Sequence, residues 1–81
     1  MDIISFQNQI QYKLLEFCYY TDDEHINVVE MLLDTDNIDL IEQNLSDTFI
    51  IDIDGNTFIC SGYDLYEYYP TDNGIKVVCI K

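Results

Sequence analysis

One stretch of this sequence contains fifteen of its sixteen carboxylates and no lysine or arginine. The stretch covers residues 14–75, between Lys13 and Lys76. The chain of 81 residues therefore has a formal net charge of −13 at pH 7. Two carboxylates about 7 Å apart in water repel each other by roughly 0.6 kcal/mol, so many such pairs oppose compaction. We expect this charge either to maintain solubility or to face a positively charged partner.

The composition is that of a folded protein and not of a disordered acidic tail. Hydrophobic residues make up 48% of the chain, and seven tyrosines and four phenylalanines are present. The length predicts a single domain, 1–81, with a small margin of stability. The segment Met1–Ser5 lacks the basic residues of a secretory signal, and the apolar runs are short. We therefore expect a cytoplasmic protein without a membrane segment.

Cysteine spacing and charge exclude several kinds of site. Cys18, Cys60 and Cys79 form no C-x-x-C pair, so we expect three reduced cysteines, no metal and no cofactor. A polyanion is repelled by nucleic acids and by anionic membranes, which argues against binding either of them directly. The sequence has no nucleophile motif, no glycine-rich phosphate loop and no arginine. It is therefore not predicted to be an enzyme.

Residues 1–46 are predicted to form two to three helices, because their apolar side chains recur at three- and four-residue steps. The first helix would follow an N-cap at Asp2 and place Ile3, Phe6, Ile10, Leu14 and Phe17 on one face. The second would begin at a capping box from Thr21 to Glu24 and bury Ile26, Val29, Leu32 and Leu33. A third, shorter helix would follow Asp36 and bury Ile38, Ile41 and Leu45.

Residues 47–81 alternate with a period of two, which predicts strands. Segments 48–53 and 56–61 flank Asp54-Gly55, a dipeptide suited to a tight hairpin turn. Ile51, Ile53, Phe58 and Cys60 would face the core, whereas Ile50 and Ile59 would pair on the opposite face. Segments 63–69 and 75–80 are predicted as two further strands. The expected fold class is α+β, with two to three N-terminal helices followed by a three- to four-stranded antiparallel β-meander.

The acidic residues are concentrated enough to nominate a partner-binding surface. Nine of them fall within residues 22–47, and a strand from Tyr63 to Tyr69 interleaves tyrosines with carboxylates. On the second predicted helix, Glu30 and Asp34 would lie about 6 Å apart, which resembles the spacing of successive phosphates. The alternative is a solvated acidic face beside an ordinary strand. The candidate partner-binding residues are Asp22, Asp23, Glu24, Glu30, Asp34, Asp36, Asp39, Glu42, Asp64, Tyr66, Glu67 and Tyr68.

With its acidic run and its tyrosine-rich strand, the chain resembles the small acidic inhibitors of bacteriophages and mobile elements. Anti-CRISPR proteins, anti-restriction proteins and uracil-DNA glycosylase inhibitors belong to this class, and several of them mimic DNA. The resemblance lies in size and charge and involves no motif. It implies a counter-defence protein in a bacterial host cell that blocks the basic nucleic-acid-binding surface of a nuclease or CRISPR effector.

Three other roles remain open at the level of the sequence. An immunity protein or antitoxin would neutralise a nuclease by the same electrostatic attraction. A small protein-protein interaction module would use Ile50 and Ile59, and its acidity would be incidental. A homodimer would form through the strand from Ile75 to Ile80 if that strand lay at an unprotected edge.

Overall fold

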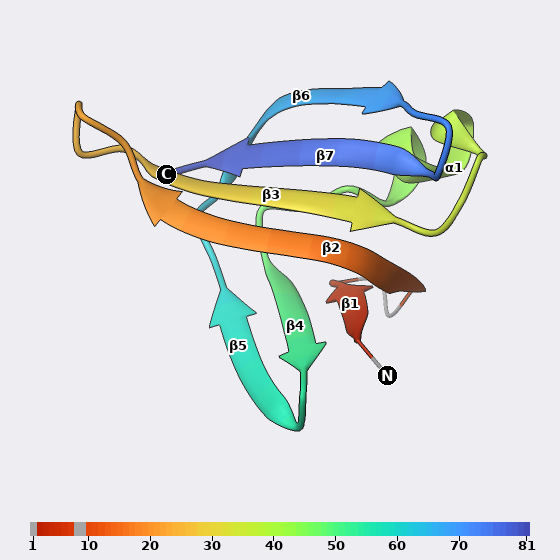
Figure 1. Cartoon of the computed structure of the whole chain (residues 1–81), viewed down its shortest axis with the longest axis horizontal. Helices are drawn as coiled ribbons and strands as arrows, with labels where there is room; N and C mark the ends of the chain where they lie inside the picture. The colour runs from red at the N-terminus through yellow and green to blue at the C-terminus, as the bar shows by residue number, and fades with distance from the viewer. Residues whose placement is uncertain (1, 8–9) are drawn as a thin grey trace.

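The computed structural model describes residues 2–7 and 10–81, which form one antiparallel sheet and one helix (Figure 1). The elements in chain order are β1 (Ile3–Phe6), β2 (Gln11–Thr21), β3 (Asn27–Leu33), α1 (Ile38–Asn44), β4 (Phe49–Ile53), β5 (Asn56–Cys60), β6 (Asp64–Pro70) and β7 (Ile75–Ile80). The strand order in the sheet is β5-β4-β1-β2-β3-β7-β6.

The predicted fold class is wrong, because the first half of the chain forms three strands where two helices were expected. A β-bulge explains the error for β2. Tyr12 and Leu14 face the core before the bulge, and Phe17 and Tyr19 face inward after it. The extra residue, Leu15, resets the alternation, so the step from Leu14 to Phe17 is three residues long. That step is also typical of a helix, although the aromatic side chains of β2 favour a strand.

The predicted capping box is the turn of the β2–β3 hairpin. Asp22 Oδ1 accepts the backbone N–H groups of Glu24 and Ile26, each at 2.9 Å. His25 in this turn has a positive φ of 65°. Thr21 Oγ1 donates to Asn27 Oδ1 at 3.0 Å instead of capping a helix. A polar side chain that binds nearby amides serves a turn as well as a helix start, and here the long pairing of β2 with β3 decides between them.

The third predicted helix is confirmed as α1. Its N-cap is Asn37 and not Asp36: Asn37 Oδ1 accepts the Leu40 amide at 3.0 Å. Ile41 is fully buried, and Ile38 and Leu45 pack against the core, as predicted. The Tyr68 hydroxyl donates to Glu42 Oε1 and so joins this helix to β6.

The four predicted strands in the second half exist, but they do not form a meander. The hairpins β4–β5 and β6–β7 lie at opposite ends of the sheet, because β1, β2 and β3 stand between them. Asp54-Gly55 is the hairpin turn, with Ile53 opposite Asn56. Strand β7 pairs with both β3 and β6, so it has no free edge. The dimer predicted through this strand therefore has no edge to use.

The sheet bends at β2, whose first part pairs with β1 and whose later part pairs with β3. In Figure 1 the β4–β5 hairpin points away from the four strands β2, β3, β7 and β6, and α1 lies behind them. The core fills the inside of this bend. Its buried members are Ile4, Phe6, Tyr12, Leu14, Val29, Met31, Leu33, Ile41, Phe49, Ile51, Tyr63, Ile75, Val77 and Cys79.

Candidate functional site

The side of strands β2, β3, β7 and β6 that points away from the core is the outer face. Residues directly opposite each other in register share a side of a sheet. The outer face therefore has three rows of side chains: Tyr20, Val28, Ile80 and Asp64; Cys18, Glu30, Val78 and Glu67; and Glu16, Leu32, Lys76 and Tyr69. Apolar side chains at the centre are surrounded by carboxylates and tyrosines.

One end of the outer face contains a depression of about 430 Å³, the outer hollow. Val28 and Val78 are its most buried lining residues, with only 6% and 7% of their surfaces exposed. Its full lining consists of Tyr20, Asp22, Glu24, Ile26, Val28, Glu30, Tyr66, Glu67, Val78 and Ile80. Four carboxylates and two tyrosine rings thus meet around an apolar base.

Two local irregularities direct polar side chains to the outer hollow. The turn at Asp22 brings Asp22 and Glu24 to the end of the β2–β3 hairpin. A β-bulge between Leu65 and Glu67 adds a residue, Tyr66, to β6. Tyr66 is exposed, and it lines the outer hollow together with Glu67. The bulge therefore lets consecutive residues of β6 reach one site.

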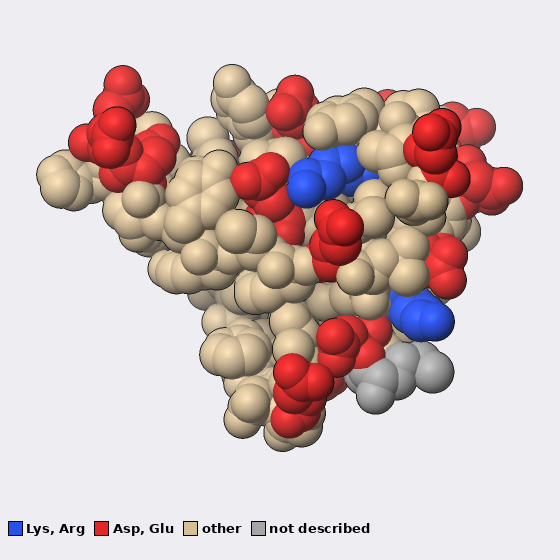
Figure 2. All heavy atoms as spheres, in the orientation of Figure 1, with Lys and Arg blue, Asp and Glu red and all other residues tan. Residues whose placement is uncertain are grey.

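The carboxylate of Glu30 organises the polar contacts at the centre of the outer face. Glu30 Oε1 lies 3.6 Å from Lys76 Nζ. A side-chain hydrogen bond with Glu30 is the main cause of the raised pKa of Tyr20, and desolvation adds to it. Figure 2 shows red carboxylates and blue lysines separated by tan side chains on this side of the molecule. The acids form separate groups here and not one continuous stripe.

Five of the twelve predicted binding residues line the outer hollow: Asp22, Glu24, Glu30, Tyr66 and Glu67. The other seven lie elsewhere. Asp34 and Asp36 line a second depression with Asp72, and Asp64 lines a third with Asp47. Asp39 and Glu42 lie on the exposed face of α1, where Tyr68 binds Glu42, and Asp23 lies at the β2–β3 turn. The predicted helical spacing of Glu30 and Asp34 is absent, because Glu30 is in β3 and Asp34 follows that strand.

The sequence interpretation missed Tyr20, Val28, Val78 and Ile80 as parts of the site. Tyr20 falls between the first and the second predicted helices, although the run Phe17–Thr21 has the aromatic and β-branched composition of a strand. Val28 and Val78 are ordinary strand residues, and only the strand order brings them under the same depression. Composition could have identified Tyr20, but no local signal could have identified the two valines.

The outer hollow combines four carboxylates and two tyrosine rings with an apolar base. Within residues 2–7 and 10–81, no three histidine, cysteine, aspartate or glutamate side chains are grouped so that they could hold a metal ion. The same part of the chain contains no helix with the length and apolarity needed to span a bilayer. The chain matches no family model, no curated protein and no solved structure.

Proposed function

We propose that this protein is a non-catalytic inhibitor that binds the basic surface of a nucleic-acid-binding protein and blocks access of the nucleic acid. The main support is the outer hollow, where four carboxylates and two tyrosines converge on an exposed sheet face. Carboxylates attract a cationic surface over a distance and accelerate association. Tyrosine rings supply contact area at a low entropic cost, and a lysine or arginine can sit over their faces.

The shape of the outer hollow favours insertion of individual cationic side chains over imitation of a long phosphate strand. Its volume is about 430 Å³ and its base is apolar, which suits the aliphatic stem of a lysine or arginine. The head group would then reach Glu30 or Glu67 at the rim. Lys76, which already lies near Glu30, would give up part of that contact when the partner binds.

The partner class follows from this chemistry. Nucleases and CRISPR effectors present lysines and arginines to nucleic acid, so their channels are suitable targets for a bacterial counter-defence protein. An immunity protein or antitoxin would bind a nuclease in the same way. Identification of the captured partner separates these two roles.

A second candidate function, an interaction module with incidental acidity, is favoured by a separate observation. Ile50 and Ile59 oppose each other on the outer side of the β4–β5 hairpin, as predicted. Their exposed fractions are 38% and 75%. An exposed pair of this kind on an edge hairpin is a suitable docking point for an apolar partner.

The experiment compares two variants with the same change in net charge. The hollow variant combines Asp22→Asn, Glu24→Gln, Glu30→Gln and Glu67→Gln, and Asn at position 22 keeps the acceptor oxygen of the turn. The control variant combines Asp34→Asn, Asp36→Asn, Asp39→Asn and Asp72→Asn. Each immobilised protein captures partners from a bacterial lysate at low salt. The affinity of the identified partner is then measured across salt concentrations, together with its nucleic-acid binding.

We expect the hollow variant to bind the partner about a hundredfold more weakly and the control variant to bind within about threefold of the parent, because four exposed charged contacts of about 0.7 kcal/mol each sum to about 2.7 kcal/mol. The parent should also release the nucleic acid from the partner. Equal losses in the two variants would contradict a specific site at the outer hollow. Binding that resists salt but is lost in the double variant Ile50→Ser, Ile59→Ser would replace the inhibitor with the interaction module.

A further inference from the structure

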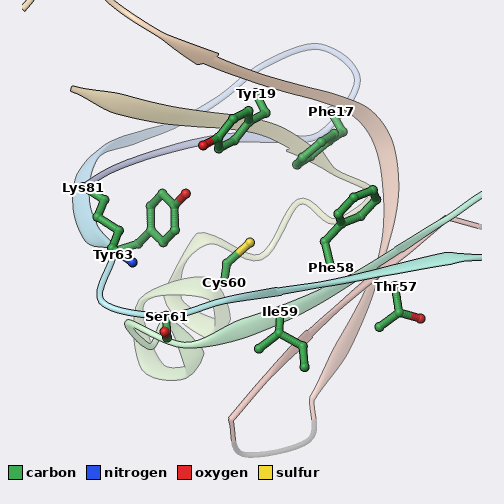
Figure 3. A pocket seen from close by; sticks show the side chains of 9 residues that line it. All are labelled: Phe17, Tyr19, Thr57, Phe58, Ile59, Cys60, Ser61, Tyr63 and Lys81. Carbon is green, nitrogen blue, oxygen red and sulfur yellow. The ribbon is translucent and has the colours of Figure 1, made fainter. Parts of the chain in front are cut away.

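The inner side of the bend contains another depression, the aromatic cavity, with a volume of about 600 Å³. It lies between the later part of β2 and the edge strand β5. Its lining residues are Phe17, Tyr19, Thr57, Phe58, Ile59, Cys60, Ser61, Tyr63 and Lys81. Figure 3 shows Phe17 and Tyr19 facing Phe58, Cys60 and Tyr63 across the cavity.

The bend of the sheet explains why this depression is open. Phe58 is directly opposite Ile51, which is completely buried, so both side chains are on the core side of the β4–β5 hairpin. Nevertheless 49% of the surface of Phe58 is exposed. Strand β5 is the last strand of the sheet and diverges from β2, so the two inner faces do not close on each other (Figure 1). The facing aromatic rings are left partly uncovered.

One end of the aromatic cavity is polar and carries a cation. Lys81 Nζ lies 5.6 Å from the centre of the Tyr63 ring. The backbone of Lys81 is fixed by two hydrogen bonds with Asn27, of 2.9 and 3.0 Å. Burial raises the pKa of Tyr63, and a hydrogen bond with Tyr19 adds to this increase. Burial also raises the pKa of Cys60, and the nearby charge of Lys81 partly offsets that increase. Two phenol groups, one thiol and one ammonium therefore share this end.

The lining of the aromatic cavity carries a positive charge, whereas the chain as a whole is strongly negative. No lining residue is an aspartate or glutamate, although the chain has a net charge of −13. The one carboxylate bonded to a lining residue, Asp52, accepts the Thr57 hydroxyl at 2.6 Å. Distant carboxylates are screened over about 8 Å at physiological ionic strength. Lys81 is thus the charged side chain in the lining of the aromatic cavity.

We propose that the aromatic cavity binds a small planar aromatic anion of one or two rings. The rings would lie between Phe17 and Phe58, which gain from aromatic contact. The anionic group would point towards Lys81 Nζ and the hydroxyl of Tyr19, which can donate to it. A volume of about 600 Å³ lies within the usual range of roughly 300 to 1,000 Å³ for ligand pockets.

This site is independent of the proposed inhibitor function. The aromatic cavity and the outer hollow share no lining residue. Neighbouring residues of β2 serve different sites, because Tyr19 points into the cavity and Tyr20 lines the hollow. Loss of ligand binding would therefore leave partner capture intact, and failure of partner capture would leave ligand binding intact.

The test uses two fluorescent probes that differ in the anionic group. Anilinonaphthalene sulfonate carries it, whereas N-phenylnaphthylamine has the same ring system without it. Each probe is titrated against the parent protein, Lys81→Gln, Phe58→Ala and the control Lys13→Gln. Lys13 is exposed and does not line the cavity, so the two lysine variants have the same net charge. Circular dichroism and thermal melting establish that each variant is folded.

We expect Lys81→Gln to weaken binding of the sulfonate about tenfold and binding of the uncharged probe less than twofold, because one charge-assisted contact is lost. Lys13→Gln should leave both probes unchanged. Phe58→Ala should weaken both probes, and a non-fluorescent naphthalene carboxylate should displace the sulfonate. The proposal is overturned if the two lysine variants behave alike, or if Phe58→Ala leaves both probes unchanged, since either result means nonspecific adsorption.

Discussion

The outer hollow and the aromatic cavity lie on opposite sides of the same sheet and have opposite chemistry. Four carboxylates surround the outer hollow. The aromatic cavity has no carboxylate in its lining and has one lysine. Strand β2 contributes Tyr20 to the first and Tyr19 to the second, although the two residues are adjacent in sequence. The contrast shows that the net charge of the chain does not predict the charge of an individual site, because the fold places carboxylates on one side of the sheet and a lysine on the other.

The largest effect is expected in the strands that separate the outer face from the core. Strands β3 and β7 form both the base of the outer hollow and the centre of the core. A Cβ at Gly74 would lie 2.1 Å from the backbone oxygen of Leu33, a contact that neither strand can relieve by moving a side chain. We expect Gly74→Ala to reduce the free energy of unfolding by about 3 kcal/mol or more. Urea denaturation measures this loss, and both sites should weaken together.

Gly55→Ala is the matched control for that variant. Gly55 has a φ of 81° at the tip of the β4–β5 hairpin, and a Cβ there would meet nothing within 4 Å. The left-handed conformation alone should cost about 1 to 2 kcal/mol. Equal losses in the two glycine variants would mean that β3 and β7 do not approach each other as closely as described.

The two sides of the sheet can also be distinguished by cysteine reactivity. Cys18 lies on the outer face and is exposed, whereas Cys79 faces the core and is buried. Burial raises the pKa of Cys79 to about 11, so its reactive thiolate is scarce as well as shielded. We expect iodoacetamide at pH 8 to modify Cys18 about a hundredfold faster than Cys79, as followed by mass spectrometry. The difference should disappear in denaturant, and similar rates in the folded protein would place Cys79 at the surface.

The raised pKa of Cys79 also leads us to expect a loss of stability at high pH. Its pKa is about 11 in the folded protein and near 9 when the chain is unfolded. Between these values the unfolded chain has released the proton and the folded chain has kept it, so stability falls as the pH rises. Cys79 should account for about 2 kcal/mol of that fall between pH 8 and pH 11. Denaturation of the parent and of Cys79→Ala at both pH values measures this share, and parallel curves would contradict it.

The smallest effect concerns two tyrosine–carboxylate pairs on opposite sides of the sheet. Hydrogen bonds to Glu30 and Glu42 are the main causes of the raised pKa values of Tyr20 and Tyr68, respectively. We expect Glu30→Gln to lower the pKa of Tyr20 and leave that of Tyr68 unchanged. Glu42→Gln should do the reverse. An NMR titration of labelled tyrosines resolves the two residues, and a change at both tyrosines in either variant would show that the sites are not separate.

Sequence patterns predicted the second half of the chain better than the first. The hairpin at Asp54-Gly55 and the short helix were predictable because turn residues and a cap act locally. Strand β2 was not predictable in this way, because its bulge interrupts the alternation of buried and exposed side chains between Leu14 and Phe17. Strand β3 was not predicted either. It is a central strand, and the apolar residues on both of its faces obscure a period of two.

The candidate site was predictable in composition and not in geometry. Glu30 and Glu67 were nominated because carboxylates are abundant in their segments, and they meet because β3 and β6 both pair with β7. Asp34 and Asp36 were nominated for the same reason and lie elsewhere. Which carboxylates share a site is therefore a property of strand order.

The sequence alone determined that this chain is strongly acidic and that it contains a hairpin at Asp54-Gly55 and a short helix after Asp36, because charge, turn residues and caps act over a few residues. The tertiary structure decided that the first half is a sheet, that the two hairpins stand at opposite ends of it, and that acidic and aromatic sites lie on opposite sides. These outcomes depend on pairing between strands distant in sequence, whose hydrogen bonds and shared burial outweigh local helical spacing.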